Sequence, residues 1–189
     1  GQPIGEGMRF VVAITGASGS MYGIRLLQNL PGEKILVISD VAREIIPYET
    51  GMSAEDVEAL ADKVLNDRDL FAPISSGSYG YDAMFVAPCS ESSVGKFANG
   101  IADTLISRAA SVCLKEGRRL ILVIRETPKS AIMLENELKL ARCGAVIMDA
   151  NPGFWDRPSS VDDIVDFIVG RCLDRVGVDN GLCRRWGGE

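Results

Sequence analysis

Five short apolar runs, each long enough for one strand, constrain the fold of this chain more than any other feature. They alternate with longer segments of helical spacing and cover residues 9–15, 34–39, 83–87, 120–124 and 145–148. The runs are rich in Val and Ile, as expected of strands that are buried on both faces. Strands that alternate with helices form parallel sheets. The sequence therefore predicts an α/β fold, a doubly wound (Rossmann-like or flavodoxin-like) parallel sheet with helices on both faces and right-handed crossovers.

The helix near the C-terminal end has the clearest signal. Apolar residues recur three, four and seven positions apart between Val161 and Val176, which is the spacing of one helix face. Ser160 and Asp163 stand just before and inside this segment in the pattern of a capping box. We therefore expect an amphipathic helix from about residue 161.

Two further helices and one loop are expected in the middle of the chain. Asp103 is a candidate cap for a helix that stops at Gly117, and Ser53 opens an acidic segment that is expected to stay helical to Leu65. The stretch 75–81 (SSGSYGY) is rich in Ser and Gly and is predicted to be a ligand-binding loop.

Length and composition indicate one folded domain. The chain has 189 residues, of which 47% are hydrophobic and 24% charged, which is typical of a globular protein. We assign residues 8–189 to a single domain and 1–7 to a flexible leader or an expression remnant. No apolar run approaches the roughly 20 residues of a membrane span, so we expect no membrane association and a cytoplasmic location. The net charge of −6 argues against nucleic acid as a partner.

The chain contains no histidine, and this excludes whole classes of chemistry. Catalytic triads with an imidazole base and imidazole metal sites are impossible, so proton transfer must use carboxylates, Lys, Tyr, Cys or the substrate. The five cysteines are widely spaced and form no C-x-x-C pair. We therefore expect reduced thiols and no metal site.

Three polar turns follow predicted strands and are expected to meet at one edge of the sheet. Their small, hydroxyl-bearing and charged residues suit a nucleotide or a flavin. The glycine spacing of the first turn matches neither the dinucleotide fingerprint nor a Walker A loop, so a tight packing turn is an equally good interpretation of that turn alone. Ser90 or Ser92 could simply cap the following helix, and adjacent Arg and Glu are more often a surface pair. The candidate residues are Gly16, Ala17, Ser18, Ser39, Ser90, Glu91, Ser92, Ser93, Arg125 and Glu126.

Other candidates are cations and aromatics outside these turns. Arg108 and Lys115 are seven residues apart on a predicted helix, hence on one face, and could together bind a phosphoryl group. Trp155 and Arg171 suit an apolar group with an anionic end, and Trp186 is a second aromatic candidate. Taken singly, each aromatic is more often a packing residue and each cation a solvated one.

The motifs in their order resemble the UbiX-type flavin prenyltransferases, within the flavoproteins that include cysteine decarboxylases. The resemblance runs from about Met8 to Trp186. It is carried by TGASG (15–19), SSGS (75–78), PCS (88–90), SRAASVCLKE (107–116), RETP (125–128), LENELKL (134–140), GAVIM (144–148) and PGFWDRP (152–158).

The resemblance implies an activity and a site. The family transfers the dimethylallyl group of dimethylallyl phosphate to N5 and C6 of reduced FMN without a metal, and the prenylated FMN serves UbiD-type decarboxylases. By motif, FMN would be held by Gly16, Ala17, Ser18, Ser39, Ser90, Glu91, Ser92, Ser93 and Arg125. The prenyl phosphate would contact Arg108, Lys115, Trp155 and Arg171, with Ser18 and Ser76 close to the reacting centre and Trp186 as a further substrate-binding candidate. Glu126 would be the acid/base carboxylate.

The resemblance also implies a homo-oligomer, for which a dodecamer is one size, with active sites shared between subunits. One departure is Trp155, where the family usually has Tyr; the indole keeps a donor but loses an acceptor. A phosphopantothenoylcysteine-type decarboxylase is disfavoured because such enzymes need a histidine. An FMN-dependent oxidoreductase or flavin carrier of the same fold group is the alternative, and an interaction module with an empty site would bind no FMN.

Overall fold

The computed structural model describes residues 7–186, so the expected leader lies almost wholly outside the described residues and its assignment stays a prediction. Six parallel strands form one sheet in the order β3-β2-β1-β4-β5-β6. The strands are β1 (Arg9–Ile14), β2 (Glu33–Ile38), β3 (Lys63–Asn66), β4 (Ala83–Val86), β5 (Arg119–Ile124) and β6 (Val146–Asp149). This confirms the predicted doubly wound α/β architecture, whose strand order reverses between β1 and β4.

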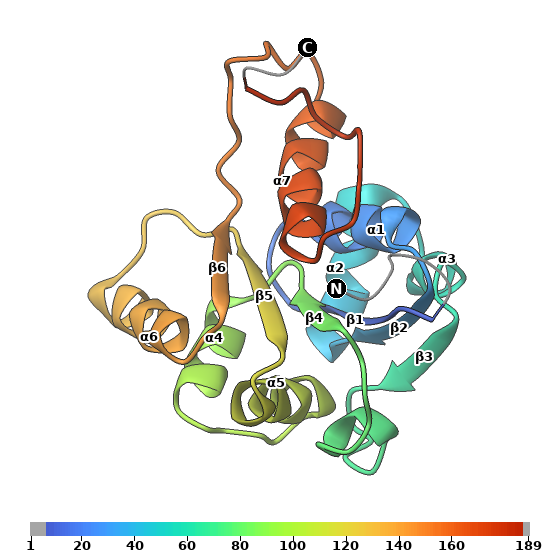
Figure 1. Ribbon diagram of the computed structural model, residues 1–189, viewed down its shortest axis with the longest axis vertical. Coiled ribbons are helices and arrows are strands. Elements are labelled where there is room, and N and C mark those ends of the chain that lie inside the picture. Colours follow the sequence, from blue (N-terminus) through green and yellow to red (C-terminus); the bar gives the residue numbers. More distant parts are fainter. Residues whose placement is uncertain (1–6, 187–189) are drawn as a thin grey trace.

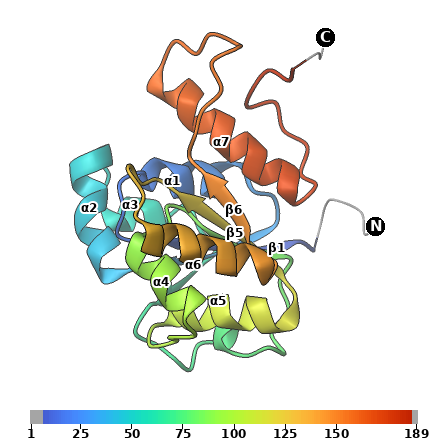
Figure 2. The same cartoon turned by 90° about the vertical axis from the view of Figure 1, so that its left-hand side faces the viewer.

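Helices cover both faces of the sheet (Figures 1 and 2). They are α1 (Ser20–Asn29), α2 (Asp40–Thr50), α3 (Ala54–Glu58), α4 (Glu91–Ala98), α5 (Leu105–Glu116), α6 (Ala131–Arg142) and α7 (Val161–Arg175), with one 3-10 turn at Pro73–Ser75. Residues of α1, α2, α3 and α7 form one hydrophobic cluster with the sheet, and residues of α4, α5 and α6 form the other.

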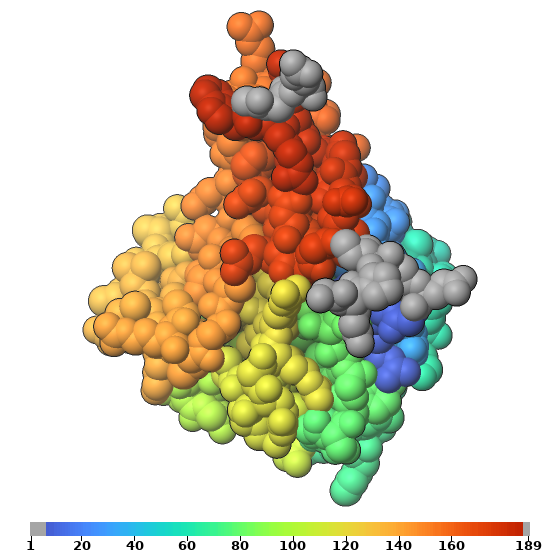
Figure 3. All heavy atoms as spheres, viewed as in Figure 1, coloured from blue at the N-terminus to red at the C-terminus, as the bar shows by residue number. Residues whose placement is uncertain are grey.

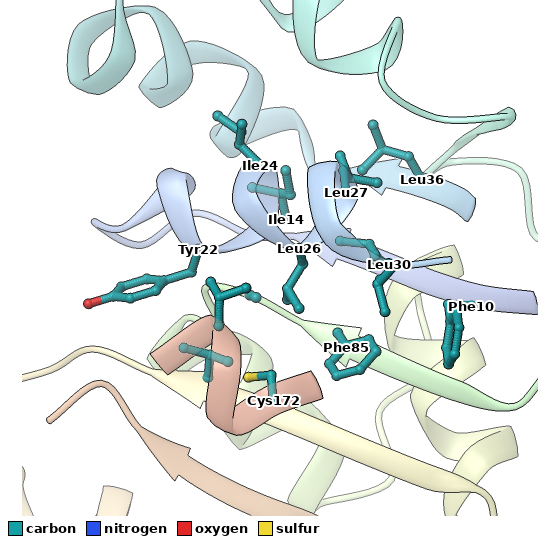
Figure 4. Close-up of a cluster of buried hydrophobic side chains, with 14 of the residues drawn as sticks. Phe10, Ile14, Tyr22, Ile24, Leu26, Leu27, Leu30, Leu36, Phe85 and Cys172 are labelled. Atoms are coloured by element: carbon teal, nitrogen blue, oxygen red, sulfur yellow. The ribbon is translucent and has the colours of Figure 1, made fainter. Parts of the chain in front are cut away.

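The strands are buried on both sides because their successive side chains enter different clusters. In β1, Phe10, Val12 and Ile14 pack toward α1 and α7, whereas Val11 and Ala13 pack toward α4 and α5. Figure 4 shows the first cluster, in which Phe10 and Phe85 lie between the sheet and the buried face of α1. Burial of this apolar surface, at roughly 25 cal/mol per Å², is the main stabilising contribution of the core.

The sequence missed β3. Residues 63–66, expected to continue a helix from Ser53, instead pair with β2 along the edge of the sheet. The helix α3 has the expected capping box of Ser53 and Asp56 but ends at Glu58. Residues 63–66 form a strand because the edge of β2 is open for pairing, and this pairing outweighs their weak helix propensity.

One predicted cap and one predicted capping box need correction. Thr104, not Asp103, caps α5, because its hydroxyl accepts from the Ser107 amide, while Asp103 pairs with Lys96. Ser160 caps α7, but the Asp163 carboxylate accepts from Ser159 rather than closing a capping box.

The predicted apolar face of α7 is mostly correct. Val165, Ile168, Cys172 and Leu173 are buried, but Val161 in the first turn is 73% exposed. Residues 150–160 run from β6 to α7, and Figures 1 and 3 show them projecting from the body beside the red segment that follows α7. We call residues 150–160 and 176–186 together the projection.

The structure adds two global observations. All five cysteines are free, and three of them are buried. No helix in the described part of the chain is long and apolar enough to cross a membrane; the cytoplasmic location stays a prediction.

Candidate functional site

The carboxyl ends of β1, β2, β3, β4 and β5 open into one cavity of about 530 Å³, which we call the edge cavity. It lies where the strand order reverses, the usual ligand position in such sheets. The three predicted turns do meet here, together with the start of α5. The lining residues are Thr15, Gly16, Ala17, Ser18, Ser39, Asp40, Val41, Ile45, Asp67, Ser90, Glu91, Ser92, Ser93, Lys96, Phe97, Thr104, Ile106, Ser107, Arg125 and Glu126.

The N-termini of α2 and α4 contribute to the edge cavity beside that of α5. Ser39 caps α2 by accepting from the Ala42 amide at 3.2 Å, and Ser90 caps α4 by accepting from the Ser93 amide at 3.1 Å. Capping and ligand binding are compatible, because the other amides of each first turn are not used by the cap. Helix N-termini carry positive potential and favour an anion such as a phosphate.

The turns after β1 and β4 are joined through Thr15. Its hydroxyl donates to the Pro88 carbonyl oxygen at 2.7 Å and accepts from the Ser90 amide at 2.8 Å. Gly16 is small for a steric reason: a Cβ atom there would lie 2.7 Å from Cγ1 of Val41. The first turn is therefore packed tightly and forms a cavity wall as well, so the two interpretations of its glycines are not exclusive.

Arg125 and Glu126 reach the edge cavity from the end of β5. The Arg125 guanidinium donates to the Ser18 carbonyl oxygen at 3.4 Å, and the Glu126 carboxylate accepts from the Thr127 amide at 3.1 Å. Both side chains are partly exposed. Arg125 and Glu126 are thus not a pair with each other; they are a cation and a carboxylate available to a ligand.

Glu49 is a site residue that sequence reasoning missed. From the last turn of α2 its carboxylate accepts from the Ser18 hydroxyl at 2.5 Å and from the amides of Gly19 and Ser20 at 3.0 and 3.2 Å. Burial works to raise the pKa of Glu49, but these hydrogen bonds outweigh it and lower the pKa below its usual value. No local motif marks Glu49, because its partners are about 30 residues away.

Asp67 and Thr104 were also missed and line the far end of the edge cavity. The Asp67 carboxylate accepts from the Ile106 amide at 2.9 Å, so a residue after β3 helps to cap α5. Burial raises the pKa of Asp67. Finding these residues from sequence would have required β3, which the sequence did not reveal.

Arg108, Lys115 and Ser76 lie together in a different hollow of about 670 Å³, which we call the α5 hollow. Arg108 and Lys115 share one face of α5, as their spacing predicts, and Lys115 pairs with Glu116 at 2.9 Å. Among the described residues that line the edge cavity, neither cation appears. Helix α5 joins the two places, because its first turn lines the edge cavity and its next turns line the α5 hollow.

Trp155 and Trp186 lie in the projection, and Arg171 lies on α7. The two indole rings pack edge to face with centroids 5.3 Å apart, and Arg171 pairs with Asp174 at 3.6 Å. These three side chains are absent from the described lining of the edge cavity. One subunit therefore brings together the residues predicted to bind FMN and Glu126, but not those predicted to bind the prenyl phosphate.

The volume and the lining residues of the edge cavity suit FMN. Its volume is within the roughly 300–1,000 Å³ of small-molecule sites. Two helix N-termini and Arg125 suit a phosphate, hydroxyls suit ribityl and ring atoms, and the 57% exposed Val41 offers apolar contact to a flat ring. The residues that would hold the group are therefore present.

Comparisons with known proteins agree with this geometry. The family model described as Flavoprotein matches residues 5–173. The chain is 51% identical over 180 residues to flavin prenyltransferase UbiX of Thermoplasma acidophilum, covering 95% of this chain and 100% of the relative. The corresponding protein of Methanothermobacter thermautotrophicus is 46% identical, with 95% of each chain covered.

Two solved structures are similar to the whole fold. AnUbiX (PadA1), in complex with FMN and dimethylallyl pyrophosphate, has a TM-score of 0.93 and 47% identity, covering 96% of this chain and 98% of its own. The dodecameric FMN-dependent UbiX-like decarboxylase of Escherichia coli O157:H7 has a TM-score of 0.93 and 46% identity, covering 96% and 100%. The chain therefore belongs to the UbiX family of flavin prenyltransferases.

Proposed function

We propose that this protein transfers the dimethylallyl group of dimethylallyl phosphate or pyrophosphate to reduced FMN. The observation that carries the proposal is the edge cavity, where two helix N-termini, Arg125 and Glu126 meet in a chain of this family. Bound reduced FMN would supply the N5 and C6 atoms that receive the prenyl group. No metal is part of the proposal.

In this proposal the edge cavity holds FMN. The N-termini of α2 and α4 favour its phosphate, with Ser39 and Ser90 at their caps. The turn after β1 and Arg125 border the ring, and the Arg125 fork can donate to ring oxygens or to a phosphate. The remaining proposed contacts are Gly16, Ala17, Ser18, Glu91, Ser92 and Ser93.

The donor needs cations to accept its leaving group. Breaking the allylic C–O bond leaves the electron pair on phosphate, and Arg108, Lys115 and Arg171 are proposed to stabilise that charge. Trp155 and Trp186 would border the allyl group, where an aromatic face stabilises developing positive charge. Ser76, in the α5 hollow, is proposed to lie near the donor.

Glu126 is proposed to be the acid/base group. Its carboxylate lines the edge cavity and has one protein partner that the structure records, the Thr127 amide. The proton displaced from the acceptor can pass to this carboxylate or to the released phosphate. Because the chain has no histidine, carboxylate and phosphate are the bases at hand.

We infer that neighbouring subunits complete the site. In one chain the α5 hollow and the projection are separate from the edge cavity, and all three must meet for the transfer. Phe71 in the α5 hollow is 98% exposed and Trp186 is 81% exposed, as expected of surfaces that a second copy covers. The E. coli O157:H7 structure described as dodecameric supports an oligomer. A UbiD-type decarboxylase is the proposed recipient of the product.

The test is a single-turnover assay under anaerobic conditions with FMN, a reductant and either donor, followed by mass analysis of the extracted flavin. We expect a flavin heavier by one C5 prenyl unit, and comparison of the two donors gives the preference between monophosphate and diphosphate. Recovery of only unmodified FMN from folded, flavin-bound protein would contradict the proposal and favour a flavin carrier. Boiled protein and omission of the donor are the controls.

A further inference from the structure

A charged residue interrupts the buried face of α6. Its inward side chains are Met133, Glu137 and Leu140, and Glu137 is only 6% exposed although Met133 and Leu140 belong to a hydrophobic cluster. The Oε1 atom of Glu137 accepts from Nζ of Lys129 at 2.7 Å, and in the described part of the chain Oε2 is buried without a hydrogen-bond partner. A carboxylate is costly at such a position unless a charge compensates it.

Lys129 also contacts a second carboxylate. Its Nζ atom donates to Oδ1 of Asp149 at 2.5 Å, and the Lys129 side chain is 15% exposed. Burial works to lower the pKa of Lys129, but the two carboxylates outweigh it and raise the pKa, so the ammonium form is retained. We call Lys129, Glu137 and Asp149 the Lys129 triad.

The Lys129 triad closes the loop that carries Arg125 and Glu126. Residues 125–129 connect β5 to the cap of α6, and at their first end Ile124 is the strand partner of Asp149. At their last end Lys129 returns to the side chain of the same Asp149. Both ends of this five-residue segment are therefore fixed to the last residue of β6.

The helix that carries Glu137 also lies next to α4, which begins at the second turn of the edge cavity. Cys89, which immediately precedes Ser90, is fully buried, and the charge of Glu137 is close enough to raise the pKa of its thiol in addition to the larger effect of burial. Figure 2 shows α6 lying beside α4, the helix that Ser90 caps, and below β5 and β6. Helix α6, which carries Glu137, thus packs against the helix that begins at the second turn.

We propose that Lys129 is a positioning residue for FMN binding: paired with Glu137 and Asp149, it fixes the segment 125–129 so that Arg125 and Glu126 point into the edge cavity. Lys129 itself does not line that cavity in the described structure. It lines a neighbouring hollow of about 470 Å³ that shares Arg125 and Glu126 with it, so the segment has open space behind it and would otherwise be free to shift. The inference rests on the proposed function for the identity of the ligand.

The experiment measures FMN affinity by quenching of flavin fluorescence in Lys129→Met, Lys129→Arg and the double variant Lys129→Met/Glu137→Met. We expect Lys129→Met to weaken FMN binding about tenfold, since a small displacement of a binding group is enough for that loss. We also expect it to reduce hydrogen-exchange protection of the backbone amides at residues 125–127 and 129. Lys129→Arg keeps the charge and should restore most of the affinity.

The double variant separates positioning from stability. Removing both buried charges should return the thermal midpoint to that of the wild type or above it, because an apolar replacement of a buried pair is often neutral or stabilising. We expect FMN binding to stay weak in this variant. Recovery of wild-type affinity with the recovered stability, or wild-type affinity in folded Lys129→Met, would overturn the proposal.

Lys63→Met is the matched control, because Lys63 pairs with Glu33 at 2.9 Å near the opposite end of the strands. It should leave the FMN affinity unchanged. The affinity measurement needs no prenyl transfer. If wild-type protein binds FMN but forms no prenylated product, the proposed function fails while the role of Lys129 is still tested.

Discussion

Ser18 and Glu49 are joined by a 2.5 Å hydrogen bond from the serine hydroxyl to the carboxylate, which ties the turn after β1 to the end of α2. The same carboxylate accepts from the amides of Gly19 and Ser20, at the start of α1. Glu49 therefore acts as a cap supplied by another helix. It fixes the conformation of the turn that is proposed to border the flavin ring.

Glu49→Gln should lower stability at neutral pH, because an amide oxygen accepts more weakly than a carboxylate and its NH₂ group cannot accept. A loss of about 1 kcal/mol is expected for an exposed carboxylate that accepts hydrogen bonds from Ser18, Gly19 and Ser20. The lowered pKa of Glu49 means that its stabilisation is present above the ordinary glutamate pKa of about 4.3 and is lost as the pH falls below that value.

Urea unfolding at several pH values checks this prediction. The difference in unfolding free energy between wild type and Glu49→Gln should be largest near pH 7 and should close below about pH 4. Glu44→Gln on the same helix is the control and should show little difference, because Glu44 is exposed and has no recorded hydrogen bond or ion pair among the described residues. A difference that grows in acid would contradict the assigned role.

Glu126→Gln should separate binding from chemistry. The carboxylate lines the edge cavity and accepts from the Thr127 amide, an interaction that the amide oxygen of Gln can keep. We expect FMN affinity to change little and product formation to slow by roughly 10²-fold or more, as for loss of a general acid/base. Flavin fluorescence and single-turnover mass analysis measure the two quantities. If FMN binding is lost instead, Glu126 holds the flavin and is not the acid/base group.

Gly23→Ala tests how closely α1 approaches the sheet. A Cβ atom at residue 23 would lie 2.4 Å from the Ala87 carbonyl oxygen and 2.8 Å from Cγ1 of Ile14. The backbone at Ala87 cannot move without shifting the turn that holds Ser90, so we expect a loss of about 1–3 kcal/mol. Helix propensity alone would predict a gain of up to about 1 kcal/mol.

Gly95→Ala in α4 is the matched control for this prediction. The nearest atom to its added Cβ, Nδ2 of Asn136, is 3.9 Å away, so helix propensity should dominate and the variant should be as stable as the wild type or more so. Denaturant midpoints of the two variants should therefore move in opposite directions. Equal stability of both variants would show that Ala87 and Ile14 can move away from the added Cβ atom at little cost.

The fold could be predicted because it depends on patterns that are local in the sequence. Runs of Val and Ile marked five of six strands, and Ser160 marked the start of α7. Strand β3 was not predicted because Lys63–Asn66 is an exposed edge strand whose residues continue a helical spacing. Only its pairing with β2, a contact between distant residues, selects the strand.

The candidate site divides in the same way. Ser39, Ser90 and Arg125 follow strands, and parallel strands bring their carboxyl ends together, so topology predicts their meeting in the edge cavity. Glu49 and the Lys129 triad depend on side-chain contacts across elements, for which the sequence has no periodic signal. Arg108 and Lys115 lie in the α5 hollow of the same chain, and their meeting with the edge cavity is proposed to depend on the arrangement of subunits.

Subunit complementation tests directly whether neighbouring subunits share active sites. Arg125→Ala should damage the edge cavity, whereas Lys115→Met should damage only the α5 hollow, because Lys115 lines that hollow and its protein partner is Glu116. If each active site combines the edge cavity of one subunit with the α5 hollow of a neighbour, co-expression brings some intact edge cavities of Lys115→Met subunits next to intact α5 hollows of Arg125→Ala subunits. Mixed oligomers should then regain roughly a quarter of the wild-type activity when the two variants assemble at random in equal amounts.

Each homo-oligomer alone should stay nearly inactive, and Lys115→Met should bind FMN like the wild type while product formation falls, because the leaving phosphate loses a cation. The activity is measured by mass analysis of the flavin, and size-exclusion chromatography establishes that the mixed protein has the wild-type size. Arg125→Ala co-expressed with Glu126→Gln is the control, because both changes damage the edge cavity and no intact site can form. Mixed Arg125→Ala and Lys115→Met oligomers that are no more active than this control would show that the α5 hollow does not serve a neighbour's edge cavity.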